Sequence, residues 1–398
     1  MAETGVRTVI KIPNAAGTLF FFTVISVATA LGAGKGKVYP SEMKRIISPE
    51  SGLTVVQFTT AASEDHHLYF TNNDLSNDCR KIVFNSDRSG SWNIFYGDLE
   101  TGKFTQLTDC QDLKVHTPCF APGRGEVYFI DGRVVKSVNT SNFQEKELFT
   151  IPDGFTGNTI LSITSDEKNL VFGYSQELEL KTQTKVIYSS QKEHWAAKPL
   201  SILVRVATDG SESTEFFREN AWFTHVQTSP TDPELVLFCH EGPWKNVAQR
   251  MWLIRTDGSG KRKLRVEEVP QVSIGHEYWF GDGVRVGYHG TDKRGEFIGI
   301  IDINTGARLE IPTKDSQFHN HGSSDSKLIV GDGTAEKPYL TIYKRDGINL
   351  KPRKIFRHGG KFSRQIAHPH PRFSPDDKMI TFTSDSGGDC NVYLLLLE

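Results

Sequence analysis

The stretch HPRFSPDDKMITFTSD, residues 370–385, combines a short strand, a Ser-Pro-Asp turn and a second apolar strand. The phrase recurs in looser form as HTPCFAPGRGEVYFI from His116, HVQTSPTDPELVLFCH from His225 and HEYWFGDGVRVGYH from His276. Further copies begin near residues 67, 157 and 318, so seven units follow one another about 40 to 65 residues apart. A repeat of this length is typical of a β-propeller.

Each unit contains short apolar runs bounded by turn formers, such as VYFI, LVLF and LIVG. Third strands end in glycine-containing turns, as at Asp98–Gly102 and Asp302–Gly306, where positive φ is required. The last unit ends at NVYLLLLE, one strand short, whereas a spare strand lies at residues 53–60. We therefore predict an all-β, seven-bladed β-propeller, closed by pairing of the N-terminal strand with the last blade and without useful helical periodicity.

The composition excludes several classes of protein. The 398 residues carry a net charge of −2 without a basic block, which argues against a nucleic-acid partner. The five cysteines are widely spread and form no CxxC pair, so neither a disulfide framework nor a thiolate metal site is predicted. No stable protein partner is predicted.

Residues 1–36 are typical of a secretory signal peptide. Arg7 and Lys11 precede an apolar run from Leu19 to Leu31, and small residues follow it. The run is short for a membrane span, although an uncleaved anchor or a misassigned start codon remain alternatives. We predict an exported, periplasmic protein whose propeller occupies residues 37–398, with cytoplasmic or N-terminally anchored locations as alternatives and membrane association only through this segment.

Seven of the 13 histidines recur at equivalent repeat positions. In a propeller, the starts of first strands and the ends of second strands open on the same face. Any single histidine could be an ordinary hydrogen-bonded or exposed residue, but the set is expected to converge on one mouth of the channel. Its members are His225, His276, His319, His368 and His370 at first strands, and His240 and His289 at second strands.

The segment QIAHPHP, residues 365–371, predicts a metal site. Residues i and i+2 of a strand face the same way, so His368 and His370 can present both imidazoles to one point. His319, on the neighbouring blade, should lie across the channel from them. Three histidines and an amide oxygen form a neutral ligand set suited to Mn²⁺ or a similar divalent ion, which stays Lewis-acidic toward an anion. A histidine-rich turn without metal is the alternative.

A second group of motifs comprises HEGPW from His240, RMW from Arg250 and HEYW from His276. Trp244, Tyr278 and Trp279 could stack on sugar rings, although each could equally pack between blades. Arg250 could instead form a salt bridge between blades or at the surface.

These phrases, with LIVGDG and RQIAHPHPRFSPDDKMITFTSD, together resemble the oligogalacturonate lyases of the pectate-lyase-22 type from about residue 53 to the C-terminus. The resemblance implies a seven-bladed propeller with Mn²⁺ in its channel. It also implies β-elimination of short, often unsaturated, galacturonate oligomers to unsaturated or 5-keto-4-deoxy monouronates. A non-catalytic, TolB-like periplasmic binding or sensory propeller is the rival hypothesis.

The resemblance also assigns roles to individual residues. It implies that His276 is the catalytic base and Arg250 the catalytic arginine. Both His319 and His321 precede the VGDG motif, and counting back from that motif favours His319 as a ligand. The implied metal ligands are His319, Gln365, His368 and His370, and the candidate substrate contacts are His225, His240, Trp244 and Tyr278.

Overall fold

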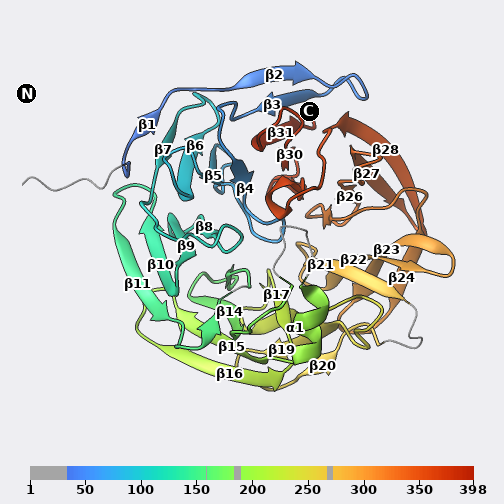
Figure 1. Ribbon diagram of the computed structural model, residues 1–398. Helices are drawn as coiled ribbons and strands as arrows, with labels where there is room; N and C mark the ends of the chain where they lie inside the picture. The colour runs from blue at the N-terminus through green and yellow to red at the C-terminus, as the bar shows by residue number, and fades with distance from the viewer. Residues whose placement is uncertain (1–33, 158, 183–189, 267–271) are drawn as a thin grey trace, which may run out of the picture.

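The computed structural model describes residues 34–398 except 158, 183–189 and 267–271. Seven antiparallel sheets surround a central channel, which confirms the predicted propeller (Figure 1). Most of the predicted leader, residues 1–33, lies outside the described residues. No helix within the described ranges is long and apolar enough to cross a membrane.

Blades 1 to 3 follow one another along the chain from β4 to β16, and blade 1 also includes β1. In blade 1, β1 joins the outer edge by pairing with β7. Blade 1 consists of β1 (Val38–Tyr39), β4 (Asp65–His67), β5 (Lys81–Ser86), β6 (Asn93–Asp98) and β7 (Phe104–Gln106). Blade 2 consists of β8 (Cys119–Ala121), β9 (Glu126–Asp131), β10 (Val134–Asn139) and β11 (Glu145–Thr150). Blade 3 consists of β12 (Phe155–Thr156), β13 (Ser162–Ile163), β14 (Asn169–Gln176), β15 (Leu200–Ala207) and β16 (Ser213–Asn220).

Blades 4, 5 and 6 each have four strands in chain order, with the first strand innermost. Blade 4 consists of β17 (Phe223–Thr228), β18 (Leu235–His240), β19 (Met251–Arg255) and β20 (Arg262–Lys263); blade 5 of β21 (Ser273–Trp279), β22 (Arg285–Asp292), β23 (Gly295–Asp302) and β24 (Arg308–Pro312); blade 6 of β25 (Asn320–Gly322), β26 (Leu328–Gly331), β27 (Tyr339–Asp346) and β28 (Asn349–Arg357).

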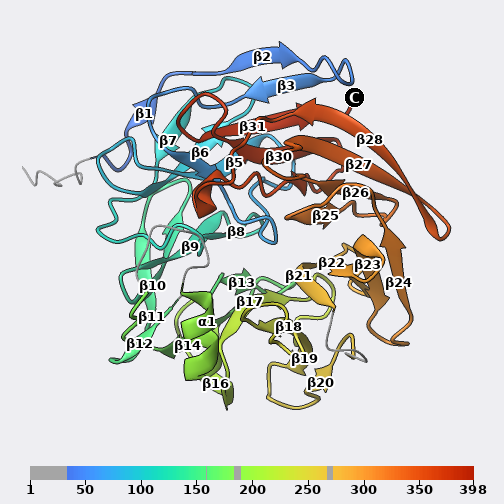
Figure 2. The same ribbon diagram turned by 45° about the vertical axis from the view of Figure 1, so that its right-hand side comes forward.

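Blade 7 closes the ring as predicted. Its C-terminal strands β29 (Arg372–Phe373), β30 (Met379–Ser384) and β31 (Asn391–Leu396) are extended by β3 (Thr54–Gln57). Val56 of β3 lies opposite Leu394 of β31. An outer strand, β2 (Lys44–Ile47), pairs with β3 and was not predicted, because its sequence KRII lacks the alternation that identifies a half-buried strand (Figure 2).

The core lies between neighbouring blades. Val55 and Leu395 of blade 7 belong to the same buried cluster as Val330 and Leu340 of blade 6. The middle strands read as nearly continuous apolar runs because both of their faces are covered by adjacent blades. The predicted turns are present as well, since Gly102 and Gly306 have φ of 71° and 70°.

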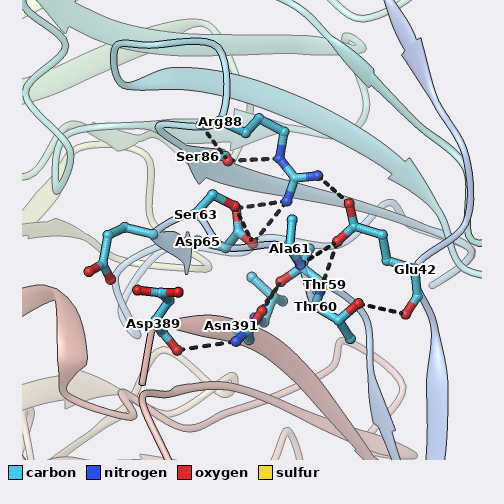
Figure 3. Close-up of polar contacts among 12 residues, drawn as sticks. Glu42, Thr59, Thr60, Ala61, Ser63, Asp65, Ser86, Arg88, Asp389 and Asn391 are labelled. Carbon is cyan, nitrogen blue, oxygen red and sulfur yellow. Dashed lines mark hydrogen bonds and ion pairs between the residues drawn. The ribbon is translucent and has the colours of Figure 1, made fainter. Parts of the chain in front are cut away.

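A buried ionic network reinforces the closure (Figure 3). The Arg88 guanidinium donates to Glu42 at 2.7 Å and to both carboxylate oxygens of Asp65 at 2.9 Å. Glu42 also accepts hydrogen bonds from the backbone N–H groups of Thr60 and Ala61. Arg88 thereby connects the N-terminal segment before β2 to the innermost strand of blade 1.

Replacing Arg88 with methionine should lower the free energy of unfolding by about 3–5 kcal/mol, because two largely buried carboxylates lose their cation. Lys81→Met is the matched control, since Lys81 pairs with Asp98 at the surface and should contribute less than about 1 kcal/mol. Urea unfolding of both variants measures the difference. Equal shifts in the two unfolding midpoints would show that the network does not stabilise the closure.

Two features differ from the sequence predictions. A seven-residue helix, α1 (Gln191–Ala197), lies between β14 and β15, where no helix was predicted. In addition, the repeat copy predicted to begin near residue 67 does not continue as a strand through residues 68–71 (LYFT), because β4 ends at His67. Residues 68–74, here called the channel segment, cross the channel instead. The Asn72 amide anchors this segment by donating to the carbonyl oxygens of Pro118 and Leu161, in blades 2 and 3.

Candidate active site

Three predicted metal ligands come together in the channel. Each of His319, His368 and His370 offers a potential ligand atom, and these atoms all lie within 4.8 Å of one another. The His319 ring lies 5.3 Å from the His368 ring and 4.1 Å from the His370 ring. His319 immediately precedes β25, and the other two precede β29, so the inner edges of blades 6 and 7 form this group.

The ring nitrogens of this group are suited to a divalent cation. His319 Nε2, His370 Nε2 and His368 Nδ1 are buried and find no hydrogen-bond partner among the described residues. Burial and the neighbouring histidines lower the pKa of all three imidazoles, so each keeps a lone pair available at neutral pH. Unpartnered buried nitrogens are costly unless a ligand binds them, so the donor set fits a metal ion.

Asp332 orients the first of these histidines. Its Oδ2 lies 2.7 Å from His319 Nδ1, and its Oδ1 accepts the backbone N–H groups of Phe318 and His319. Burial raises the pKa of Asp332 to about 7, whereas the two backbone hydrogen bonds favour the ionised form. A carboxylate on the opposite ring nitrogen directs the unpartnered Nε2 toward the group, as in many metal sites.

His276 lies beside the three-histidine group, and its ring centroid is 4.2 Å from that of His319. It sits on a β-bulge of β21 and has a φ of 50°, a conformation that is costly for a non-glycine residue. His225 has the same φ on the corresponding bulge of β17. The same strained backbone conformation occurs at equivalent positions of two blades. It indicates that both histidine side chains must point into the channel.

A hydrogen-bonded chain fixes the tautomer of His276. His289 donates to the backbone of Phe318, which leaves its other nitrogen, Nε2, as an acceptor. His276 Nδ1 lies 2.9 Å from this Nε2 and therefore carries the proton. The Nε2 atom of His276 therefore carries a free lone pair. Burial, together with the nearby His319 and His289, keeps the pKa of His276 well below its usual value. His276 is thus uncharged at neutral pH.

Arg250 is held rigidly between two carboxylates. Its Nε donates to Glu277 at 2.9 Å and its Nη1 to Glu241 at 3.1 Å, and all three side chains are largely buried. The pKa of Arg250 is raised by these partners, so the guanidinium is permanently charged. One cation and two carboxylates leave a local charge of −1, because the surrounding histidines are neutral. A divalent ion on the three-histidine group would reverse this sign.

A cavity of about 260 Å³ lies beside Arg250 and His276, and its lining does not include the three-histidine group. Five of the predicted site residues line it, namely His225, Trp244, Arg250, His276 and Gln365. Its wall also includes Trp222, beside α1, whose ring stacks on that of His194.

Two predicted contacts lie elsewhere. His240 stacks on Phe223 and lines a neighbouring pocket with Trp195. Tyr278 is buried, packs against His321 and lines a separate cavity at the other end of the channel. His321 itself contacts Arg372 rather than the three-histidine group, so the structure favours His319 over His321 as a ligand.

The channel segment supplies residues that the sequence analysis missed. The Tyr69 ring lies within 6.2 Å of the rings of His116, His225 and His370, and it lines the cavity. The Phe70 ring stacks on His370 and also contacts the rings of His276 and His319. His66 is a further missed histidine, and its ring contacts the rings of His116 and His370. His116 opens the quoted repeat copy HTPCFAP, so its equivalence to His225 and His276 was a usable signal.

The fold and the channel define a propeller with a candidate metal centre and a neutral histidine beside it. The family model described as oligogalacturonate lyase matches residues 33–398, and the chain belongs to this family. It is 30% identical over 387 residues to the oligogalacturonate lyase of Dickeya dadantii, covering 90% of this chain and 97% of that protein.

Solved structures agree with this assignment. An oligogalacturonate lyase in complex with manganese is 30% identical, with a TM-score of 0.84 over 92% of this chain and 98% of that one. The oligogalacturonate lyase from Vibrio parahaemolyticus is 25% identical, also with a TM-score of 0.84, over 92% and 99% of the two chains.

Proposed function

We propose that this protein is a manganese-dependent lyase that cleaves short galacturonate oligomers, saturated or unsaturated, by β-elimination. The products would be unsaturated or 5-keto-4-deoxy monouronates, as in the breakdown of pectin. The observation that carries this proposal is the neutral His276, whose tautomer is set by its contact with His289. Its ring centroid lies 4.2 Å from that of His319, and the chain belongs to the oligogalacturonate lyase family.

His319, His368 and His370 would hold the metal, with the side-chain oxygen of Gln365 as a fourth ligand. Gln365 belongs to a 3₁₀ turn, η1 (Gln365–Ala367), directly before His368. The solved relative that contains manganese supports the choice of this ion. A divalent ion at this position supplies Lewis acidity toward a substrate carboxylate.

The reaction requires removal of the proton on C5, which is α to the carboxylate and poorly acidic. The lone pair on His276 Nε2 accepts this proton, and the Nδ1–H donated to His289 stabilises the imidazolium that forms. Arg250 offers its remaining N–H groups to a substrate carboxylate or to the departing glycosidic oxygen. No water is consumed, so the paired carboxylates of a glycosidase are not needed.

The substrate would lie along the mouth of the cavity. Trp244 provides an aromatic face beside His276 and His289, with ring centroids at 6.5 and 5.9 Å. His225, 3.8 Å from Glu241, lines the same cavity and would contact the uronate adjacent to the cleaved bond.

The direct test is an assay with unsaturated digalacturonate. Metal-depleted protein should be inactive, and added Mn²⁺ should restore formation of monouronate, followed by chromatography of the products. Tight binding of the disaccharide without turnover would instead support the non-catalytic alternative.

His289 is expected to act as a positioning residue. His289→Phe preserves the ring but removes the acceptor of the His276 proton, so kcat should fall by about 10- to 100-fold while KM changes little. Steady-state kinetics separate the two constants, and the metal content should remain at the wild-type level. A His289→Phe enzyme with unchanged kcat would show that the tautomer of His276 is not set by this contact.

We also propose that residues 1–36 export the chain to the periplasm. The apolar run that follows Arg7 and Lys11 supports this location. Fractionation of cells that express the full chain and a chain lacking residues 2–36 tests it. Recovery of both from the cytoplasm would contradict export.

A further inference from the structure

The loop that carries two of the three grouped histidines has little regular structure of its own. His368 and His370 lie between η1, which ends at Ala367, and β29, which begins at Arg372. His370 has a φ of 48°, a conformation that is costly for a non-glycine residue. Strained backbone persists only where its surroundings hold it. Contacts from other parts of the fold must therefore fix residues 368–371, here called the blade 7 loop.

Blade 1 contacts this loop through His67, the last residue of β4. The Nε2 atom of His67 lies 3.1 Å from the carbonyl oxygen of Pro369, the residue between the two histidines. A carbonyl oxygen can only accept a hydrogen bond, so His67 carries a proton on Nε2 and donates it to Pro369. The carbonyl is the one backbone group of Pro369 that can form a hydrogen bond, because proline has no N–H. It also accepts the backbone N–H of Thr383, so blades 1 and 7 both donate to it.

Asp74, the last residue of the channel segment, fixes the other nitrogen of this imidazole. Its Oδ2 lies 3.0 Å from His67 Nδ1, and both side chains are buried. The same carboxylate attracts Arg372, which directly follows the blade 7 loop and donates to the Phe70 carbonyl oxygen. A buried pair of ionisable side chains adds little stability relative to apolar side chains of the same volume. Stability alone therefore does not account for the pairing of Asp74 with His67.

The preceding residue of β4 contacts the blade 7 loop as well. His66 Nε2 lies 3.4 Å from His370 Nδ1, the nitrogen opposite the unpartnered Nε2 of that ring. The other two histidines of the group are held in a comparable way, one by Asp332 and one by the backbone of Phe362. Partners on the opposite ring nitrogen orient the ligands of many metal sites. Two consecutive residues of β4 thus support the half of the group that belongs to blade 7.

We propose that His67, held by Asp74, is a positioning residue of the metal site. Through the Pro369 carbonyl, it fixes the blade 7 loop so that His368 and His370 face the third histidine across the channel. This role rests on the proposed function, because it requires that the three histidines bind Mn²⁺. Its consequence is that the metal affinity depends on blade 1, which contributes none of the four candidate ligands. Hydrogen bonds around the ligands of metal sites typically change the affinity by about tenfold to 100-fold.

Calorimetric titration of the metal-depleted protein with Mn²⁺ tests this role. The side-chain amide of asparagine can replace the Nδ1 donor of a histidine, and that of glutamine can replace the Nε2 donor. His67→Asn keeps the contact with Asp74 but loses the donor to Pro369, so the Mn²⁺ affinity should fall by about tenfold or more. His67→Gln keeps the donor to Pro369, and its affinity should stay within about threefold of the wild type. Equal affinities of the two variants would overturn the proposal.

Thr59→Val is the matched control for a loss of stability. It removes a hydroxyl that accepts the backbone N–H of Val392 at the ring closure, so the melting temperature should fall. The Mn²⁺ affinity of Thr59→Val should nevertheless stay within about twofold of the wild type. Equal losses of affinity in Thr59→Val and His67→Asn would show that the affinity follows the stability of the ring, which would contradict the positioning role.

Asp74→Asn decides the question if His67→Asn does not fold. It keeps the shape of the side chain and an acceptor for His67 but weakens their contact, so the Mn²⁺ affinity should fall by about threefold to tenfold. Unchanged affinity in Asp74→Asn would contradict the role of the pair. Because Mn²⁺ binding needs no turnover, a wild type that binds Mn²⁺ but forms no monouronate would refute the lyase activity alone. A wild type that binds no Mn²⁺ would overturn the positioning role.

Discussion

Replacing His276 with alanine should lower kcat on unsaturated digalacturonate by about 10²- to 10⁴-fold, because the reaction loses its general base. The structure gives this residue the required properties. Its Nδ1 proton is committed to His289, its Nε2 carries a lone pair, and its ring lies next to His319. The bulge of β21 that aims this side chain is a feature of the backbone and should survive the substitution.

Two controls separate loss of the base from loss of structure. Metal content and the melting temperature of His276→Ala should match those of the wild type, since the three potential ligands come from other blades. Deuterium at C5 of the substrate provides a further measurement, because a slow proton transfer in the variant should show a primary isotope effect. Retention of the full wild-type rate in His276→Ala would remove this residue from the mechanism.

The sequence predicted the ring and the convergence of three histidines because both depend on repeat positions. His319, His368 and His370 do lie together in the channel, but the expected strand alternation is not the reason, since His368 follows a 3₁₀ turn, His370 has a φ of 48° and both precede β29. Closure by residues 53–60 followed from counting strands, and β3 indeed pairs with β31. Neither prediction required knowledge of the side-chain packing.

The channel segment could not be predicted in this way. Residues LYFT resemble the apolar start of a strand, but Asn72 directs them across the channel by bonding to blades 2 and 3. This crossing explains why Tyr278, two residues beyond His276 on the same strand, lines a different cavity. Tyr278 also follows the β-bulge that contains His276, and it belongs to the same buried cluster as Phe70.

The two histidines predicted at the ends of second strands, His240 and His289, have different surroundings. A second strand lies one layer away from the channel, so its end reaches the site only if the side chain points inward. His289 does so and bonds to His276, whereas His240 stacks on Phe223 and points toward Glu219. Their positions differ by one residue in the pairing register, because His289 lies opposite Gly275 just as Cys239 lies opposite Thr224, whereas His240 lies opposite Phe223. Neighbouring residues of a strand point to opposite faces, so the predicted equivalence of the two histidines was wrong.

Substitution of a metal ligand is expected to have the second large effect. His319→Ala should lose stoichiometric manganese and at least about 10³-fold in activity, because it removes a ligand and also leaves Asp332 buried without its partner. Without the ion, Arg250, Glu241 and Glu277 leave the cavity with a charge of −1, which disfavours an anionic substrate. Elemental analysis after dialysis measures the bound metal, and the assay with unsaturated digalacturonate measures the activity.

A graded variant distinguishes the ligand from its support. Asp332→Asn keeps His319 and its Nε2 but weakens the hydrogen bond that orients the ring, so manganese affinity should fall by about 10- to 100-fold. Saturating Mn²⁺ should then restore most of the activity of Asp332→Asn, whereas it should not restore His319→Ala. A high manganese concentration can compensate for a weakened affinity, as in Asp332→Asn, but not for a missing ligand, as in His319→Ala. The contrast between the two variants therefore tests the histidine group itself. Full activity of His319→Ala at any manganese concentration would show that the metal, if required, binds elsewhere in the channel.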